Sequence, residues 1–533
     1  MNALIILYYE GYKSDYAYIP WNFFFVFMTL FVEGAMLSPA SSLLKTKIKN
    51  EKGENMGKKK VKEDGVYLYA NNAADVTGSS IFIKCNGKQI LLECGMVQKN
   101  DYLENYRLNS EKFPFNPSDI DYVFIGHVHV DHIGLLGRLV KEGFNGKIIC
   151  SHATAMLMKP LLLNSAFILK SEVCTLSYKY KRDYKPIYDE DDVYRVLDLV
   201  YEYDELHTEY VLDDVVSFEW LENSHCLGAR QLRLSLTNKL GVKEHILYTS
   251  DIGSLCTKNH YLKNTEIDNR NYLYAFMEST YGVDSRQTKK TREFDIEHLK
   301  VGIETTLERG GTFIMPCFSF SRTQEILTNL YEIFHDKDFK YNVIVDSMLS
   351  VDICNIYDQL LTNEDLELWT KVRNWDNVRF ITEKDESSAC VKDHTPKIVI
   401  SSSGFCTNGR ILSYLHEYLS DEKSMICFSG YIGDNNSYLS YKVKNYKENK
   451  VIKISGDSVK NKIDCMTLHT MSSHASHKDL IEFGSSLNTS KLVLVHGSVE
   501  AKNCLKEKLQ DEICKKDKSF KVIASTKDMF LRL

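Results

Sequence analysis

The sequence predicts an α/β protein whose sheets contain parallel strands. Two observations support this class: short apolar runs alternate with helical stretches, and only short turns separate them. The chain has 533 residues, of which 44% are hydrophobic and 26% are charged, with both signs mixed. This length is enough for two or three domains around a large buried core.

The first half of the chain supplies several candidate strands. Residues 80–84 and 89–92 flank Asn86-Gly87, a pair typical of a two-residue hairpin turn. Residues 147–150 form another short apolar run, and residues 245–249 lead to Asp251. We therefore expect a hairpin, followed by strands that present polar side chains at their ends.

The second half continues the same alternation. Residues 295–307 and 322–334 have helical patterns, and the second of these is amphipathic. Strands are expected at residues 312–315, 342–345, 397–400 and 492–495. The last strand would deliver His496, so it has to return to the part of the fold that holds the other histidines.

Residues 1–64 are expected to lie outside the fold. Residues 21–32 are apolar but too short for a typical membrane span, and a lysine-rich linker follows. A membrane anchor at residues 21–38 is the alternative, and a start of translation at Met56 is a further hypothesis. The net charge of -6 gives no global nucleic-acid signature, and 14 scattered cysteines without a CxxC pair favour a cytoplasmic protein.

A cluster of metal-capable side chains follows the apolar run at residues 122–125. It reads His127-Val128-His129-Val130-Asp131-His132. Alternate side chains at a strand end point the same way, so His127, His129 and Asp131 would converge, with His132 at the turn. Imidazole and carboxylate are ligands that zinc prefers. The pattern therefore predicts a metal site.

This cluster is the first of an ordered series that resembles the metallo-β-lactamase superfamily and, within it, the β-CASP nucleases. The later members are His225-Cys226-Leu227-Gly228-Ala229, Tyr248-Thr249-Ser250-Asp251, Glu278-Ser279-Thr280-Tyr281-Gly282, Ser473-His474-Ala475 and Val495-His496-Gly497. The resemblance implies an αββα sandwich with an inserted β-CASP cap of parallel α/β type. It places the sandwich at residues 65–282 and 462–533 and the cap at 283–461.

The resemblance also implies two zinc ions. One would be held by His127, His129 and His225. The other would be held by Asp131, His132 and His496, with Asp251 bridging the two. Two such ions suit phosphodiester hydrolysis, since they activate water and neutralise phosphate charge.

The catalytic residues that the resemblance implies are Asp131, Glu278 and His474. His474 would donate the proton to the leaving oxygen, and Glu278 would orient its imidazole. Glu93 departs from the family pattern, because an aspartate usually stands there and supports the ligand loop from behind. Its extra methylene is expected to loosen that support.

Substrate contacts are predicted in the cap, in the loop after residues 397–400. Backbone amides near glycine and a guanidinium suit an anion, so the candidates are Ser403, Gly404, Gly409 and Arg410. The resemblance associates His496 in the last motif with RNA-acting members. Because the chain ends 37 residues after His496, it is similar to compact bacterial and archaeal members.

The sequence thus predicts a zinc-dependent ribonuclease of RNA processing or decay, with RNA as its partner. Endonuclease and 5′ exonuclease activity both stay open, and so does a homodimer. Three alternatives remain: a small-molecule metallohydrolase of the same superfamily, a DNA nuclease, and a catalytically weak paralogue that binds RNA or scaffolds a complex.

Overall fold

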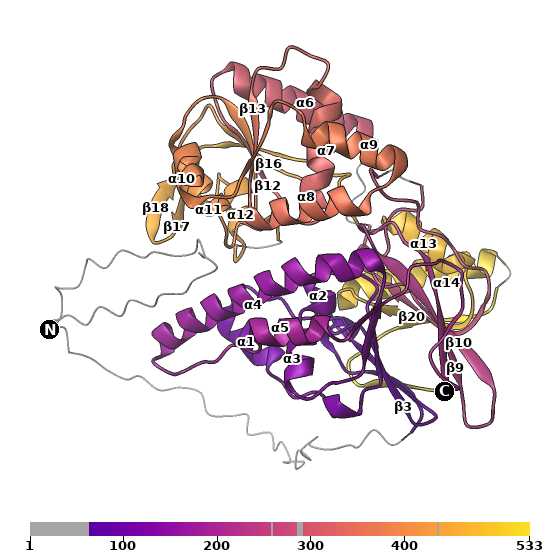
Figure 1. The fold of residues 1–533 in the computed structure, drawn as a ribbon. Coiled ribbons are helices and arrows are strands. Elements are labelled where there is room, and N and C mark those ends of the chain that lie inside the picture. Colours follow the sequence, from indigo (N-terminus) through magenta and orange to yellow (C-terminus); the bar gives the residue numbers. More distant parts are fainter. Residues whose placement is uncertain (1–62, 257–258, 285–290, 434–435, 517) are drawn as a thin grey trace, which may run out of the picture. The chain divides into compact units, whose positions relative to one another are not determined.

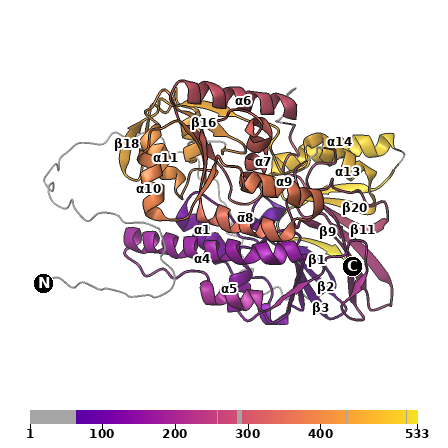
Figure 2. The same ribbon diagram turned by 45° about the horizontal axis from the view of Figure 1, so that its top comes forward.

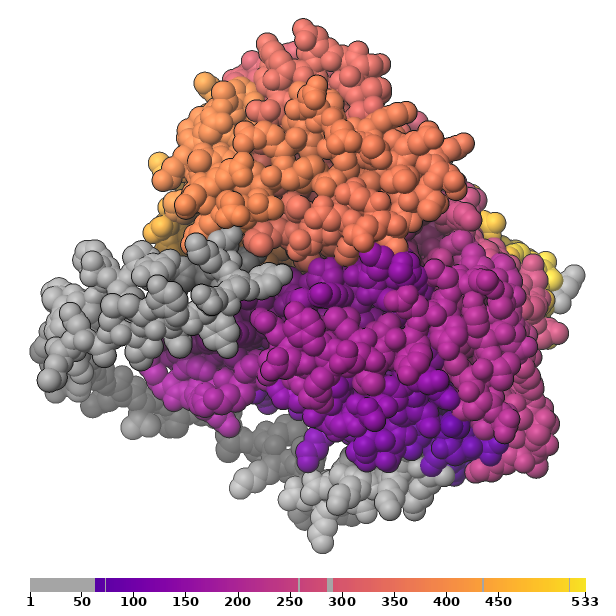
Figure 3. Space-filling view, viewed as in Figure 1, coloured from indigo at the N-terminus to yellow at the C-terminus, as the bar shows by residue number. Residues whose placement is uncertain are grey.

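A computed structural model describes residues 63–533 apart from 257–258, 285–290, 434–435 and 517. The predictions for residues 1–62, including the anchor at residues 21–38, lie outside the described residues. The described chain belongs to one compact unit, and Figure 3 shows its surface from the early residues (indigo) to the cap (orange).

The first sheet has seven strands in the order β22-β1-β2-β3-β4-β5-β6. Its strands are β1 (Gly65–Leu68), β2 (Ile81–Cys85), β3 (Lys88–Leu92), β4 (Tyr122–Phe124), β5 (Lys147–Cys150), β6 (Val200–Glu202) and β22 (Met529–Arg532). Strands β3 to β6 are parallel, whereas β22, β1, β2 and β3 pair antiparallel. The C-terminal strand β22 therefore lies at the edge of this sheet, paired with β1.

The second sheet also has seven strands, in the order β21-β20-β11-β10-β9-β8-β7. They are β7 (Tyr210–Val211), β8 (Val216–Glu222), β9 (Arg230–Thr237), β10 (Lys243–Tyr248), β11 (Asn271–Glu278), β20 (Asn488–Val495) and β21 (Lys521–Ala524). Strands β10, β11, β20 and β21 run parallel. Strand β20 thus lies beside β11, so His496, which follows β20, comes close to Glu278 at the end of β11.

The two sheets face each other across one apolar core. Leu232, Leu234 and Leu236 alternate along β9 and point into it, as the two-residue period of a strand demands. In β20, Val493 faces this core whereas Leu492 faces the helices on the other side. A strand buried on both faces explains why residues 492–495 are a continuous apolar run.

Helices cover the outer face of each sheet. The first sheet is covered by α2 (Val130–Ile133), α3 (Leu136–Lys141), α4 (His152–Tyr180) and α5 (Glu190–Leu197), with α1 (Tyr102–Asn109) beside α4. The second is covered by α13 (His477–Ser486) and α14 (Val499–Lys515). The layers are helix, sheet, sheet and helix, so the predicted αββα sandwich is confirmed.

Helix α4 is, among the described residues, long and apolar enough to cross a membrane by length and composition. Its apolar residues are used inside the fold, because Leu157, Leu162 and Leu169 belong to the core cluster of the first sheet. The helix also packs against α8 (Met348–Leu360) of the cap, as Figure 2 shows. Burial between two layers explains its hydropathy.

The cap sheet is wholly parallel and has the order β14-β13-β15-β12-β16-β19. Its strands are β12 (Phe313–Pro316), β13 (Asn342–Asp346), β14 (Val378–Ile381), β15 (Lys397–Ser401), β16 (Met425–Phe428) and β19 (Asp464–Thr467). The hairpin β17 (Val451–Ile454) and β18 (Asp457–Lys460) stands apart from it. The inserted parallel cap is confirmed.

Helices lie on both faces of the cap sheet. One face carries α6 (Arg292–Glu308), α7 (Arg322–Phe334), α8 and α9 (Asn363–Arg373). The other carries α10 (Lys384–Lys392), α11 (Ile411–Tyr418) and α12 (Leu439–Lys444). After residue 461, the predicted end of the cap, β19 still pairs with β16 in the cap sheet before the chain returns to the sandwich.

The loop after β3 is joined to the histidine loop like a short extra ladder. The amide of Cys94 donates to the carbonyl of His132 at 2.8 Å, and that of Met96 donates to Val130 at 3.0 Å. Gly95 lies between them, and a Cβ built on it would stand 1.7 Å from the carbonyl oxygen of Asp131. Only glycine permits this approach.

We expect Gly95→Ala to displace the histidine loop and to cost about 3 kcal/mol of stability, since the clash is with backbone. The midpoint of thermal unfolding and the bound metal should both fall. Gly87→Ala is the matched control, because its φ is +87° but nothing lies within 4 Å of the added Cβ. It should cost about 1 kcal/mol from backbone strain alone. Equal midpoints for the two variants would contradict the argument.

Candidate metal centre and active site

The candidate site lies where strands of the two sheets end. Asp251, Glu278 and His496 come at the ends of β10, β11 and β20, which are neighbours in the second sheet. Parallel neighbours end at the same edge, so their side chains meet there. The loop after β4 brings His127 to His132 from the first sheet, and the loop between β8 and β9 brings His225.

Three imidazoles form the first donor group. Nε2 of His127 lies 3.0 Å from Nδ1 of His129, and Nε2 of His225 lies 3.1 Å from the same atom. Burial holds the pKa values of His127 and His225 well below their usual range and lowers that of His129 to about 4. The three rings are therefore neutral, as metal ligands have to be.

The second donor group consists of Asp131, His132 and His496. Nε2 of His496 lies 3.4 Å from Oδ2 of Asp131 and 3.4 Å from Nε2 of His132. All three donor atoms lie within 4.8 Å of one another. This set mixes nitrogen and oxygen donors, which zinc accepts.

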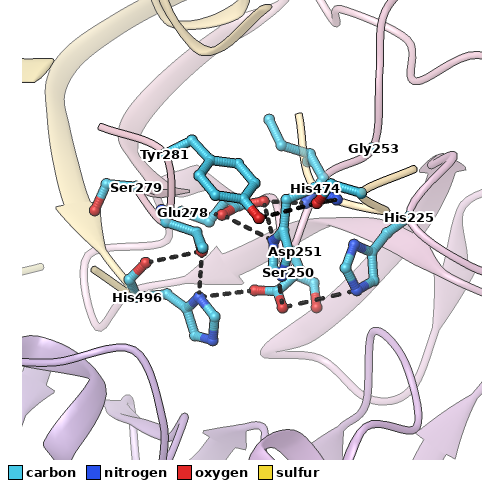
Figure 4. A network of polar contacts seen from close by, with 12 residues as sticks. His225, Ser250, Asp251, Gly253, Glu278, Ser279, Tyr281, His474 and His496 are labelled. Carbon is cyan, nitrogen blue, oxygen red and sulfur yellow. Dashed lines mark hydrogen bonds and ion pairs between the residues drawn. The ribbon is translucent and has the colours of Figure 1, made fainter. Parts of the chain in front are cut away.

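Asp251 stands between the two groups. Its Oδ2 is 3.3 Å from Nε2 of His132 and 3.8 Å from Nε2 of both His127 and His225. Figure 4 shows this carboxylate between His225, His474 and His496. Burial raises the pKa of Asp251, but His496 and His132 outweigh it and hold the value well below the usual range. The bridging position assigned to Asp251 thus fits a buried, ionised carboxylate.

The residues present fit a pair of divalent cations. The neutral imidazoles of the first group and the ionised carboxylate of Asp251 face one space in the protein interior, where charges without a counter-ion are costly. Despite burial, Asp251 and Asp131 raise the pKa of His132 well above its usual range, and a bound cation would take the place of that proton. Within the described chain, the structure brings together every one of the predicted ligands.

Glu93 supports the histidine loop from behind. Its Oε1 accepts hydrogen bonds from the amide of Gly126 at 3.1 Å and from Oγ of Ser250 at 3.0 Å. The same oxygen is 3.5 Å from Nδ1 of His132, and Ser250 also reaches Nδ1 of His127 at 3.0 Å. The longer glutamate therefore still contacts the loop at both ends of the ligand series.

His474 is held by Glu278 beside the two donor groups. Its Nδ1 lies 3.0 Å from Oε1 of Glu278, which also accepts the amide of Ile252 at 2.9 Å (Figure 4). Burial lowers the pKa of His474, but the Glu278 carboxylate outweighs it and raises the pKa to about 9. With Nδ1 engaged, Nε2 is the ring nitrogen left for a substrate.

Ser476, where the family pattern often has aspartate, has a structural role. It is the N-cap of α13, and its hydroxyl accepts the amide of Asp479 while Asp479 caps the Ser476 amide in return. This capping box fixes the start of the helix directly after His474.

The loop after β15 holds the predicted substrate contacts, and its side chains mostly bind the loop itself. Oγ of Ser403 accepts the amide of Thr407 at 3.1 Å. A Cβ on Gly409 would lie 2.3 Å from the carbonyl oxygen of Ser402, so this glycine permits a tight turn at φ +82°. Gly404 packs beside the ring of Phe318.

Arg410, predicted as a phosphate contact, is hydrogen-bonded within the cap. Its guanidinium donates to Oδ1 of Asp346 at 2.6 Å and to the carbonyls of Ile381 and Thr382. These contacts hold the loop after β15 in position. The pattern could not reveal this, because Asp346 is 64 residues away in sequence.

Arg322, at the first position of α7, is a site residue that the sequence argument missed. It lines a cavity together with His225, Ser472 and Ser473, next to the candidate centre. Within the described part of the chain, its guanidinium has neither a hydrogen bond nor an ion pair. Burial lowers its pKa, and the nearby Glu325 carboxylate offsets only part of that effect.

Comparisons with known proteins agree with this architecture. Three family models match in order: the metallo-β-lactamase superfamily at residues 74–219, the β-CASP domain at 323–438, and the Zn-dependent metallo-hydrolase RNA specificity domain at 462–522. Together they follow the sandwich, its cap and its returning part.

Curated relatives match along most of the chain. Ribonuclease TTHA0252 of Thermus thermophilus is 27% identical over 80% of this chain and 92% of its own length. The transcription termination factor FttA of Methanocaldococcus jannaschii is 26% identical over 82% and 67%, respectively. Integrator complex subunit 11 of Danio rerio is 26% identical over 82% and 70%. The chain belongs to the β-CASP family of the metallo-β-lactamase superfamily.

Proposed function

We propose that this chain is a zinc-dependent ribonuclease that hydrolyses phosphodiester bonds of RNA at a two-metal centre. The observation that carries the proposal is the position of Asp251, whose one oxygen faces both donor groups beside the His474–Glu278 pair. Two zinc ions, when bound, would supply an activated water and neutralise charge on the phosphate.

The protein's own residues would divide the remaining work. His127, His129 and His225 would hold one ion, and Asp131, His132 and His496 the other. Glu278 fixes the ring of His474 through Nδ1, so Nε2 can give a proton to the oxygen that leaves. Glu93 keeps the histidine loop in place.

Arg322 is our proposed phosphate contact, in place of Arg410. Its guanidinium lines the cavity that also contains His225 and Ser473, and among the described residues it has no hydrogen-bond or ion-pair partner, so an RNA phosphate would satisfy it. Ser403, Gly404 and Gly409 remain candidates for backbone contacts further along the cap.

RNA is the substrate we favour over DNA or a small molecule. The relatives whose printed names state an activity include ribonucleases, and the model matching residues 462–522 describes RNA specificity. Residues of the cap helix α7 line the cavity beside His225 and so extend the binding surface, which suits a polymer better than a small molecule.

The experiment that tests the function uses one RNA labelled at either end, with a 5′ triphosphate, monophosphate or hydroxyl, next to a DNA of the same sequence. We expect zinc-dependent cleavage of the RNA and at least tenfold slower cleavage of the DNA. The pattern of labelled products separates endonuclease from 5′ exonuclease action. Equal cleavage of DNA, or turnover of thioesters but not of RNA, would contradict the proposal.

His474→Ala and Asp131→Ala form a matched pair that separates proton donation from metal binding. The first should lower the cleavage rate by roughly 10²- to 10⁴-fold and keep the metal content, since our proposal gives His474 the role of proton donor and not of ligand. The second should bind less metal, because it removes an oxygen donor from the second group. Metal analysis and single-turnover kinetics measure both. Full turnover in His474→Ala would exclude it as proton donor.

Arg322→Ala should lower kcat/KM for RNA by roughly 10- to 100-fold, the usual value of hydrogen bonds to a charged group. Arg379→Ala is the control, since Arg379 is an exposed cap arginine that pairs with Glu386. It should cleave RNA like the wild type. If both variants behave alike, the cavity arginine does not bind phosphate.

A further inference from the structure

A second cavity opens in the cap next to the candidate active site. It has a volume of about 170 Å³ and lies between the ends of β16 and β19 and the last residue of α12. Its wall includes Ser429, Tyr431, Lys444, Thr467 and Ser472. None of the residues proposed to hold metal or to donate a proton belongs to it.

Ser472 connects this cavity to the catalytic histidine. It lines both this cavity and the one that contains Arg322. Its Oγ lies 3.0 Å from the hydroxyl of Tyr281, and the Tyr281 ring stands edge-on to His474 with 5.8 Å between centroids. An RNA strand bound at the metal centre could therefore extend directly into this cavity.

The polar groups of the cavity suit an anion and a hydrogen-bonding base. Among the described residues, Lys444 lines it, no carboxylate does, and the Lys444 amine has no ion-pair partner. Oγ1 of Thr467 is buried without a hydrogen-bond partner among the described residues. A nucleotide would satisfy both groups, because its phosphate can pair with the amine of Lys444 and its base can hydrogen-bond to Oγ1 of Thr467.

Aromatic rings stand at the same place. Tyr431 is 51% exposed, and its ring centroid lies 6.0 Å from that of Phe405 and 6.4 Å from that of Tyr438. Phe318, 42% exposed, packs edge-on against Phe405 at 5.2 Å. Such exposed rings are platforms on which unpaired bases stack, and the stacking tolerates any sequence.

This aromatic group is anchored close to the metal ligands. Phe320, only two residues after Phe318, packs its ring against His129 with 5.6 Å between centroids. One tight turn thus presents Phe320 to the ligand set and Phe318 to the surface. Because Phe318 and Phe320 belong to the same short segment, the backbone sets the distance between the aromatic group and the metal ligands.

We infer that the cavity bounded by Tyr431 and Lys444 binds one unpaired nucleotide of the RNA, next to the one being cleaved. The base stacks on Tyr431, and a backbone phosphate pairs with the amine of Lys444. The inference rests on the proposed ribonuclease function and deepens it, because it assigns the base and phosphate beside the scissile bond to named residues of the cap. A duplex keeps its bases stacked inside and cannot offer one to the ring.

The test is a scan with RNAs that carry a single abasic nucleotide at successive positions around the cleavage site. Wild-type protein should lose roughly 5- to 100-fold in kcat/KM at one position flanking the scissile bond, the usual worth of one stacked base. Tyr431→Ala should cleave intact RNA more slowly by a similar factor and lose the sensitivity at that position. Tyr431→Phe, which keeps the ring, should restore both.

Lys444→Gln should lower the slope of log affinity against log salt by about 0.7, the value of one phosphate contact on a single strand. Tyr446→Ala and Lys442→Ala are the controls, since these neighbours do not line the cavity. They should match the wild type in both measurements. Thermal unfolding of each variant verifies that it is folded.

The outcomes separate this inference from the proposed function. Cleavage of intact RNA together with a flat abasic profile, or a profile that Tyr431→Ala leaves unchanged, overturns the nucleotide site and leaves the ribonuclease standing. Absence of RNA cleavage by the wild type overturns both. Equal cleavage of the strand free and in duplex also overturns the inference.

Discussion

Imidazoles and carboxylates from both sheets converge in the protein interior, and this convergence determines how the fold is arranged. Ring nitrogens lie 3.0 to 3.4 Å apart around a buried carboxylate, and a divalent cation would stabilise this set of donors. Every layer serves this arrangement: parallel strands end at one edge, glycine permits the loops to touch, and Glu93 fixes the histidine loop from beneath.

The insertion of the cap follows from the same requirement. The chain leaves the second sheet after Glu278 and returns in β20, whose Val495 is paired with Glu278. Because the two strands are direct neighbours, His496 meets Asp251 whatever is inserted between them. The cap is therefore free to build its own sheet and core, and with them the surfaces along which an RNA strand would lie.

Much of this could be predicted from the sequence, because local patterns carry it. The histidine series, the turn at Asn86-Gly87 and the helix at residues 322–334 each depend on near neighbours. Other features depend on distant partners. Arg410 turns to Asp346, β19 joins the cap sheet, and the cavity at Tyr431 and Lys444 needs three separate segments. Arg322 is informative because none of the described residues forms a hydrogen bond or ion pair with its guanidinium, and no sequence pattern displays this.

Strand β19 connects the position of the cap to that of His474. It is an edge strand of the cap sheet, and only residues 468–473 separate it from His474, whose neighbour Ala475 is bonded to Ile252 of the sandwich. His474 thus lies at the end of a short connection between the cap sheet and the sandwich. Glu278 and Ile252 hold His474 and Ala475 on the sandwich side, so a substitution that displaces β19 would act on the position of His474 through residues 468–473.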